Sequence, residues 1–138
     1  MTKLILNIIT PEKHVIVDKG VDFVVLPAYD GEMGVLPGHV PFVVQLKEGV
    51  LRYKSGQEEG IFAVIGGFAE LAGDHMAVFA EAAELAEEID SEKARQELQK
   101  AKDSLVTCGA DMDINAAQAA LKRAILRVKV SEMRKVKK

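Results

Sequence analysis

The sequence predicts a β + α chain, with an antiparallel β-rich part over residues 1–87 and an antiparallel two-helix hairpin over residues 88–138. Two observations carry this prediction. Turn-forming residues recur about every 8–12 residues through the first part, a spacing typical of an all-β sandwich or barrel. Near residue 88 the apolar residues change from strand-like runs to steps of three and four, which indicate helices. The chain has 138 residues, 49% of them apolar, which is enough for one modest core.

The β-rich part is expected to contain about eight to ten short strands. The first run is apolar and β-branched and is stopped by Pro11. The second run ends at Gly20, and the third is expected to end at Pro27. Later runs are separated by two or three turn-forming residues: Lys47-Glu48-Gly49, Ser55-Gly56, Gly66-Gly67 and Gly73-Asp74.

The hairpin is predicted from two amphipathic repeats. Asp90 or Ser91 can cap the first helix and Asp113 the second, while Gly109 suits the end of the first. The second helix is expected to run to about Met133. Four of the nine predicted facing residues are alanine, which buries little area, so the hairpin should be only marginally stable by itself. These facing residues are Ala94, Leu98, Ala101 and Leu105 in the first helix, and Ile114, Ala117, Leu121, Ala124 and Val128 in the second.

Charge is distributed unevenly along the chain. Residues 1–89 carry 14 acids and 6 bases, a net −8, whereas residues 90–138 carry 7 acids and 12 bases, a net +5. A basic helix can face solvent or bind an anionic partner. No nucleic acid is expected as a partner, because the chain has no tryptophan and only 5% aromatic residues to stack on bases. The basic residues of the second helix are Lys122, Arg123, Arg127, Lys129, Arg134 and Lys135.

No enzyme motif is present in the sequence: there is no phosphate-binding P-loop, dinucleotide fingerprint or G-x-S-x-G elbow. His14, His39 and His75 lack the spacing of a metal site, so no metal is expected. The single cysteine, Cys108, has no neighbouring histidine and fits a reducing compartment. No apolar run is long enough to span a membrane, and the N-terminus is expected not to be a secretory or organelle-targeting signal.

The stretch "DGEMGVLPGHVPF", residues 30–42, is the densest cluster of special residues. Asp30-Gly31 is a hairpin-turn dipeptide. Gly34 and Gly38 permit unusual backbone angles, while two prolines stiffen the path. One interpretation is a pair of tight turns that only join strands. The other, which we favour over a catalytic role, is a rigid surface for docking a protein partner, because a stiff loop loses little entropy on binding.

Three stretches resemble the ATP synthase epsilon subunit family. "GEMGVLPGHVPFV" resembles its G-E-x-G-x-x-P-G-H-x-P signature, "FAVIGGFAEL" its following strand pair, and "DINAAQAALKRAILRVKV" its second C-terminal helix. The resemblance runs the full length in the same order. It implies an N-terminal antiparallel β-sandwich followed by the helical hairpin, in a bacterial F-type complex.

The resemblance also implies partners and a location. Such subunits sit in the central stalk, bound to the gamma subunit and resting on the ring of c subunits, at the cytoplasmic face of the plasma membrane without inserting into it. Glu32 and His39 would then lie at the c-ring contact. The hairpin would either fold down or rise toward the alpha/beta catalytic head, where it blocks ATP hydrolysis. The chain itself would have no catalytic residue and would require no cofactor.

In some members of the family the folded hairpin binds ATP as a regulatory ligand, through an I/L-D-x-x-R-A motif. Here "IDSEKA" matches it except that lysine replaces the arginine, which removes a two-pronged donor. The resemblance assigns the candidate ATP-binding set Glu84, Ile89, Asp90, Lys93, Ala94, Arg123 and Arg127.

Two other classes of protein remain open at this point. One is a free-standing nucleotide-sensing module that uses the same hairpin outside any synthase. The other is a small β-fold enzyme in which Glu32 and His39 act as an acid–base pair.

Overall fold

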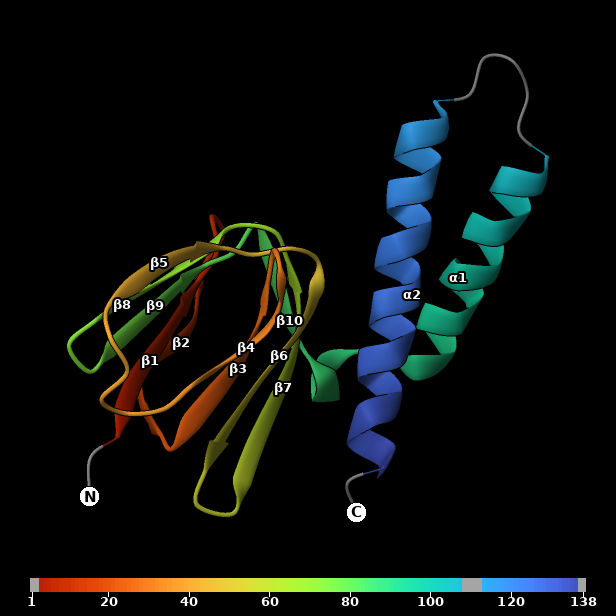
Figure 1. Ribbon diagram of the computed structural model, residues 1–138. Helices are drawn as coiled ribbons and strands as arrows, with labels where there is room; N and C mark the ends of the chain where they lie inside the picture. The colour runs from red at the N-terminus through yellow and green to blue at the C-terminus, as the bar shows by residue number, and fades with distance from the viewer. Residues whose placement is uncertain (1–2, 108–112, 137–138) are drawn as a thin grey trace. The chain divides into compact units, whose positions relative to one another are not determined.

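The computed structural model describes residues 3–107 and 113–136 and confirms the predicted β + α class. Ten strands form two five-stranded sheets, and two helices follow (Figure 1). The chain divides into two compact units, Met1–Leu85 and Ala86–Lys138. The predictions for Cys108 and Gly109 lie outside the described residues.

The first sheet has the strand order β2-β1-β9-β8-β5. Its strands are β1 (Leu4–Ile9), β2 (His14–Val21), β5 (Phe42–Gln45), β8 (Phe68–Ala72) and β9 (His75–Phe79). Among the described strands, β1 and β9 form the one parallel pair, in the register Ile5 to His75. This pairing needs no tight turn, because the two strands are distant in the sequence.

The second sheet has the strand order β10-β7-β6-β3-β4, and all its pairs are antiparallel. Its strands are β3 (Phe23–Ala28), β4 (Gly31–Val35), β6 (Gly49–Ser55), β7 (Glu58–Ile65) and β10 (Ala82–Leu85).

The core of the sandwich is built from alternate residues of the strands. In β1, Leu4, Leu6 and Ile8 are fully buried while the residues between them are half-buried. Phe62 is the largest of the fully buried side chains in the described residues. Period-two burial of this kind is what a strand with one face on a core requires. Other large core residues are Leu26, Leu51, Tyr53, Leu71 and Met76.

Three details in the β-rich part differ from what the sequence suggested. Pro27 does not end its strand: it lies inside β3, where pairing with β6 has already stopped at Val25, so its missing N–H breaks no ladder on that side. The β3–β4 turn is formed by Tyr29 and Asp30, one position earlier than predicted, because Ala28 and Gly31 are already paired. Gly34 does not adopt a positive φ either, whereas Gly38 does, at 86°.

The helical unit starts with a short 3-10 turn, η1 (Ala86–Glu88), which the sequence pattern did not predict. Helix α1 spans Ser91–Val106 and is capped by Asp90. Helix α2 spans Ile114–Val136, three residues beyond the expected end, and Asp113 caps it by accepting a bond from the N–H of Ala116 (3.2 Å). The two helices pack side by side as an antiparallel hairpin (Figure 1).

Candidate functional site

A stiff loop over residues 36–41 forms the first candidate site, in the sandwich unit. A tight turn closes it, with the N–H of His39 donating to the carbonyl of Leu36 (3.1 Å). Gly38, at φ 86°, supplies the left-handed conformation that this turn requires. The side chains of Leu36 and Val40 are 63% and 70% exposed, and Val43 at the start of β5 is 67% exposed. The loop therefore presents apolar side chains to solvent from a fixed backbone.

Glu32 and His39, the two polar residues predicted at this surface, engage different partners. The Glu32 carboxylate lies 3.7 Å from the guanidinium of Arg52 on β6. His39 Nδ1 lies 2.7 Å from the carbonyl of Val40, so this nitrogen carries the hydrogen and donates. Its ring also meets Phe42 edge to face, with centroids 5.2 Å apart. The two contacts of His39 orient its ring, whereas the ion pair of Glu32 is long and exposed; each residue thus has a partner other than the one that the acid–base pair hypothesis requires.

Arg52 is a partner of Glu32 that the sequence reasoning missed. The two residues are 20 positions apart in the sequence, and β3 lies between their strands in the sheet. No local motif signals such a pair, because it depends on the register of three strands. The Pro27–Glu32 and Val25–Arg52 pairings supply that register.

The start of α1 holds the first part of the second candidate site. Asp90 Oδ1 accepts bonds from the N–H groups of Glu92 (3.1 Å) and Lys93 (3.2 Å), which satisfies two donors of the first helical turn. Ile89 and Ala94 are buried, whereas the side chain of Lys93 is exposed. Asp90 therefore has a structural role as a helix cap, whatever else it does.

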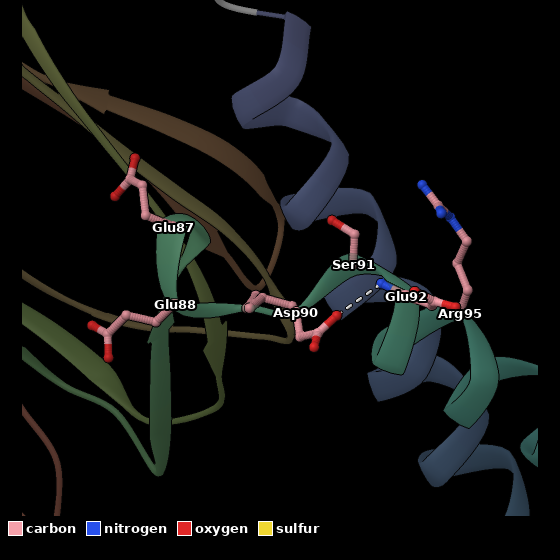
Figure 2. A pocket seen from close by; sticks show the side chains of 7 residues that line it. Glu87, Glu88, Asp90, Ser91, Glu92 and Arg95 are labelled. Carbon is pink, nitrogen blue, oxygen red and sulfur yellow. Dashed lines mark hydrogen bonds between the residues drawn. The ribbon is translucent and has the colours of Figure 1, made fainter.

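An open hollow of about 530 Å³ lies at this helix start. Figure 2 shows the carboxylate of Asp90 turned toward the first turn of α1, with its hydrogen bond to the N–H of Glu92. The hydroxyl of Ser91 is buried and has no hydrogen-bond partner in the described part of the chain. With four carboxylates and one guanidinium, the hollow would repel a phosphate. Its lining residues are Glu87, Glu88, Ile89, Asp90, Ser91, Glu92 and Arg95.

The two candidate arginines lie on α2, one turn apart on one face. Arg127 forms an ion pair with Glu97 of α1, with Nη1 and Oε2 2.5 Å apart. This contact joins the α1 face that carries Lys93 and Glu97 to the α2 face that carries Arg123 and Arg127. Sequence reasoning missed Glu97, although its position one turn after Lys93 could have indicated it.

Glu84, the remaining member of the predicted set, lies on β10 in the sandwich unit. It is half-buried there, and its backbone pairs with Ala63 of β7. The other six members belong to the helical unit.

Two further features bear on the class of protein. Within residues 3–107 and 113–136, no group of three His, Cys, Asp or Glu side chains could hold a metal ion; His14 and His75 begin β2 and β9, and His39 lies in the loop. No helix in these ranges is long and apolar enough to cross a bilayer.

A β-sandwich unit followed by a two-helix unit defines a class of small two-part β + α proteins. Two family models match the chain: the ATP synthase Delta/Epsilon chain beta-sandwich domain over residues 3–86, and the long alpha-helix domain of the same chain over residues 87–132. The chain belongs to the ATP synthase delta/epsilon family.

Curated relatives are similar over most of the chain. The ATP synthase epsilon chain of Syntrophobacter fumaroxidans is 45% identical over 130 residues, 94% of this chain and 96% of the relative. That of Elusimicrobium minutum is 50% identical over 105 residues, 76% and 78% of the two chains. These homologues are a non-catalytic subunit of the rotary complex, which contradicts the small-enzyme hypothesis.

Two solved structures contain a chain of similar fold. A chain in the Euglena gracilis mitochondrial ATP synthase structure that contains OSCP, F1 and the c-ring has a TM-score of 0.72 and 25% identity, covering 96% of this chain and 79% of that one. A chain from the central stalk and c-ring of the Tetrahymena thermophila enzyme has the same fold, with a TM-score of 0.59 and 14% identity.

Proposed function

We propose that the chain is a rotor subunit of an F-type ATP synthase at the cytoplasmic face of a bacterial plasma membrane. In this role it binds the gamma subunit and contacts the c-ring through the loop and β4. The observation that carries the proposal is the rigid, apolar loop over residues 36–41 in a chain of this family. Its fixed backbone, its exposed Leu36 and Val40, and the anchored side chains of Glu32 and His39 support a docking surface.

The loop can be tested by replacing one exposed valine. Val40→Ser removes apolar surface at the loop, and Val17→Ser is the matched control, because Val17 is similarly exposed (62%) but lies on β2. Each variant is expressed in cells that lack the native subunit, and membranes from these cells are assayed. We expect Val40→Ser to lower ATP-driven proton pumping relative to ATP hydrolysis, and Val17→Ser to leave this ratio unchanged. Equal ratios for the two variants would exclude the loop as the c-ring contact.

We also propose that the hairpin restrains ATP hydrolysis and that ATP binds it as a regulatory ligand. The small residues among the predicted facing positions of the interhelical seam support the first part: Ala94 and Ala124 are buried but contribute little area, while Leu98, Leu105, Leu121 and Val128 are only half-buried. Such a seam lets a competing partner open the hairpin at a modest cost in free energy. The basic side chains near Arg127 support the second part, since a polyphosphate requires them.

The regulatory role predicts a gain of hydrolysis on removal of the hairpin. A chain that ends at Glu88 should assemble into the complex and raise its ATPase activity, and the full chain should lower it. Co-purification of the full chain with gamma would at the same time reject the free-standing nucleotide sensor. Unchanged ATPase activity after the truncation would contradict inhibition by the hairpin.

A further inference from the structure

The ion pair between α1 and α2 involves one of the candidate phosphate-binding residues. The side chain of Arg127 is only 25% exposed, and its guanidinium contacts the Glu97 carboxylate, which is 41% exposed. A guanidinium recognises carboxylate and phosphate oxygens by the same planar donors. The Glu97 carboxylate thus already pairs with the Arg127 guanidinium that a polyphosphate would need.

The surroundings of this pair are basic along both helices. Lys93 lies one turn before Glu97 on α1, and Arg123 lies one turn before Arg127 on α2. Because the helices are antiparallel, Lys93 and Arg123 lie on opposite sides of the Glu97–Arg127 contact, each about 5–6 Å along its helix axis. The Glu97 carboxylate therefore lies between cations.

We propose that Glu97 is an internal competitor that lowers the affinity of the hairpin for polyphosphate ligands such as ATP. This inference rests on the proposed ATP-binding role. A triphosphate must either displace the carboxylate from Arg127 or bind beside it against like-charge repulsion. Both routes weaken binding, so Glu97 sets the concentration at which the hairpin responds to ligand.

The alternative role for Glu97 is to hold Arg127 in position for the ligand, and it predicts the opposite sign. If Glu97 positions Arg127, Glu97→Gln should weaken binding. If Glu97 competes with the ligand, Glu97→Gln should strengthen binding by about two- to fivefold, the range expected for a partly exposed charge pair. Glutamine keeps the size and helix propensity of glutamate, so the fold is preserved.

A second ion pair between the same helices provides the matched control. Arg95 Nε and Glu132 Oε1 lie 3.6 Å apart, and this pair shares no residue with the Glu97–Arg127 pair. Glu132→Gln removes the same charge and also breaks one interhelical pair. It therefore reports how much of any gain in ligand affinity comes from the change in net charge or from the loss of an interhelical ion pair.

The test is calorimetric titration of the full chain with ATP and, separately, with inorganic tripolyphosphate. We expect tighter binding of both ligands by Glu97→Gln, little change with Glu132→Gln, and loss of the gain in the double variant Glu97→Gln/Arg127→Ala. If Glu97→Gln binds the ligand and the unmodified chain does not, this result also supports the role of Glu97 as a competitor.

Two results would overturn the inference and are distinguishable. In the first, the unmodified chain binds ATP and Arg127→Ala abolishes this binding, but Glu97→Gln binds no more tightly than the unmodified chain. This result leaves the ATP-binding role intact and contradicts the role of Glu97 as a competitor. No binding by either the unmodified chain or Glu97→Gln at several millimolar ligand removes both.

Discussion

At the scale of the residue, Asp90 shows how one side chain can belong to a motif and still be explained by local structure. Its carboxylate accepts two N–H bonds from the first turn of α1. A cap of this kind requires an oxygen acceptor but not a charge. A ligand-binding carboxylate, in contrast, also depends on its negative charge, so the two roles respond differently to substitution.

Replacement of Asp90 separates these roles. Asp90→Ala should lower the stability of the helical unit by about 1 kcal/mol because the cap is lost, whereas Asp90→Asn should lower it by only a few tenths. Urea unfolding followed by far-ultraviolet circular dichroism measures both. If asparagine destabilises as much as alanine, the charge of Asp90 rather than its capping oxygen stabilises the helix.

Asp22 makes the stability of the sandwich depend on pH. The N–H of Gly56 donates to Asp22 Oδ2 (2.7 Å) and Lys3 lies 3.2 Å from Oδ1, and these contacts, the first foremost, hold the pKa of Asp22 below its usual 3.8. A lowered pKa means that the folded state favours the charged form. The resulting stabilisation is present above pH 3.8 and is lost as the pH falls through the lowered pKa.

We therefore expect Asp22→Asn to be less stable than the unmodified chain at neutral pH and to converge with it in acid below pH 3.8. Urea unfolding across this pH range is the measurement. Asp30→Asn, in the exposed β3–β4 turn, serves as the control for a change of net charge. A difference that stays constant from neutral pH to acid would show that Asp22 acts through shape alone.

At the scale of the element, the turns of the sandwich differ in how strongly they depend on glycine. Gly67, between β7 and β8, has φ 92°, and an added Cβ would lie 1.9 Å from the carbonyl oxygen of Phe79. Gly73, between β8 and β9, has φ 63°, with nothing within 4 Å of an added Cβ. The β7–β8 turn requires a positive φ at Gly67 and also brings the backbone of Phe79 close to this glycine. The β8–β9 turn requires only the positive φ at Gly73.

The two glycines should therefore respond differently to alanine. Gly73→Ala should cost about 1 kcal/mol for the left-handed conformation alone. Gly67→Ala should cost more than about 3 kcal/mol, because strand β9 must also move. Urea unfolding followed by tyrosine fluorescence reports the difference, since Tyr53 is buried in the sandwich core. Equal losses of unfolding free energy would indicate that β9 can shift at Phe79 at little cost in free energy.

At the scale of the whole molecule, the two units differ in the core that each can form alone. Every residue of the main core cluster lies before residue 86, so the sandwich contains its own core. The hairpin has two helices joined by two ion pairs and by a narrow apolar seam, in which four of the nine predicted facing residues are alanine. Isolated helices gain most of their stability from packing, and a seam of this kind provides little.

Fragments test this difference. Residues 1–86 alone should unfold cooperatively in urea, with the buried Tyr53 as probe, whereas residues 86–138 alone should be only partly helical by circular dichroism. A sandwich fragment that fails to fold would show that its core is incomplete without the second unit. If the hairpin fragment is fully helical and melts cooperatively, the prediction that the hairpin is only marginally stable by itself is wrong.

The sequence alone determined the features that depend on neighbours along the chain. The helix caps at Asp90 and Asp113, the Gly66-Gly67 turn and the change of period near residue 88 follow from local backbone chemistry, and the structure confirms them. Even the small errors at Pro27 and Asp30 concern where a strand ends, which depends on its partner strands.

Only the tertiary structure decided which distant residues meet. The Glu32–Arg52 and Glu97–Arg127 pairs, and the parallel pairing of β1 with β9, join positions 20 to 70 residues apart. The free energy of such contacts depends on strand register and helix packing, which are set by the whole core and leave no short-range pattern. The basic residues that a polyphosphate would need are therefore visible in the sequence, but the contact of Arg127 with Glu97 required the fold.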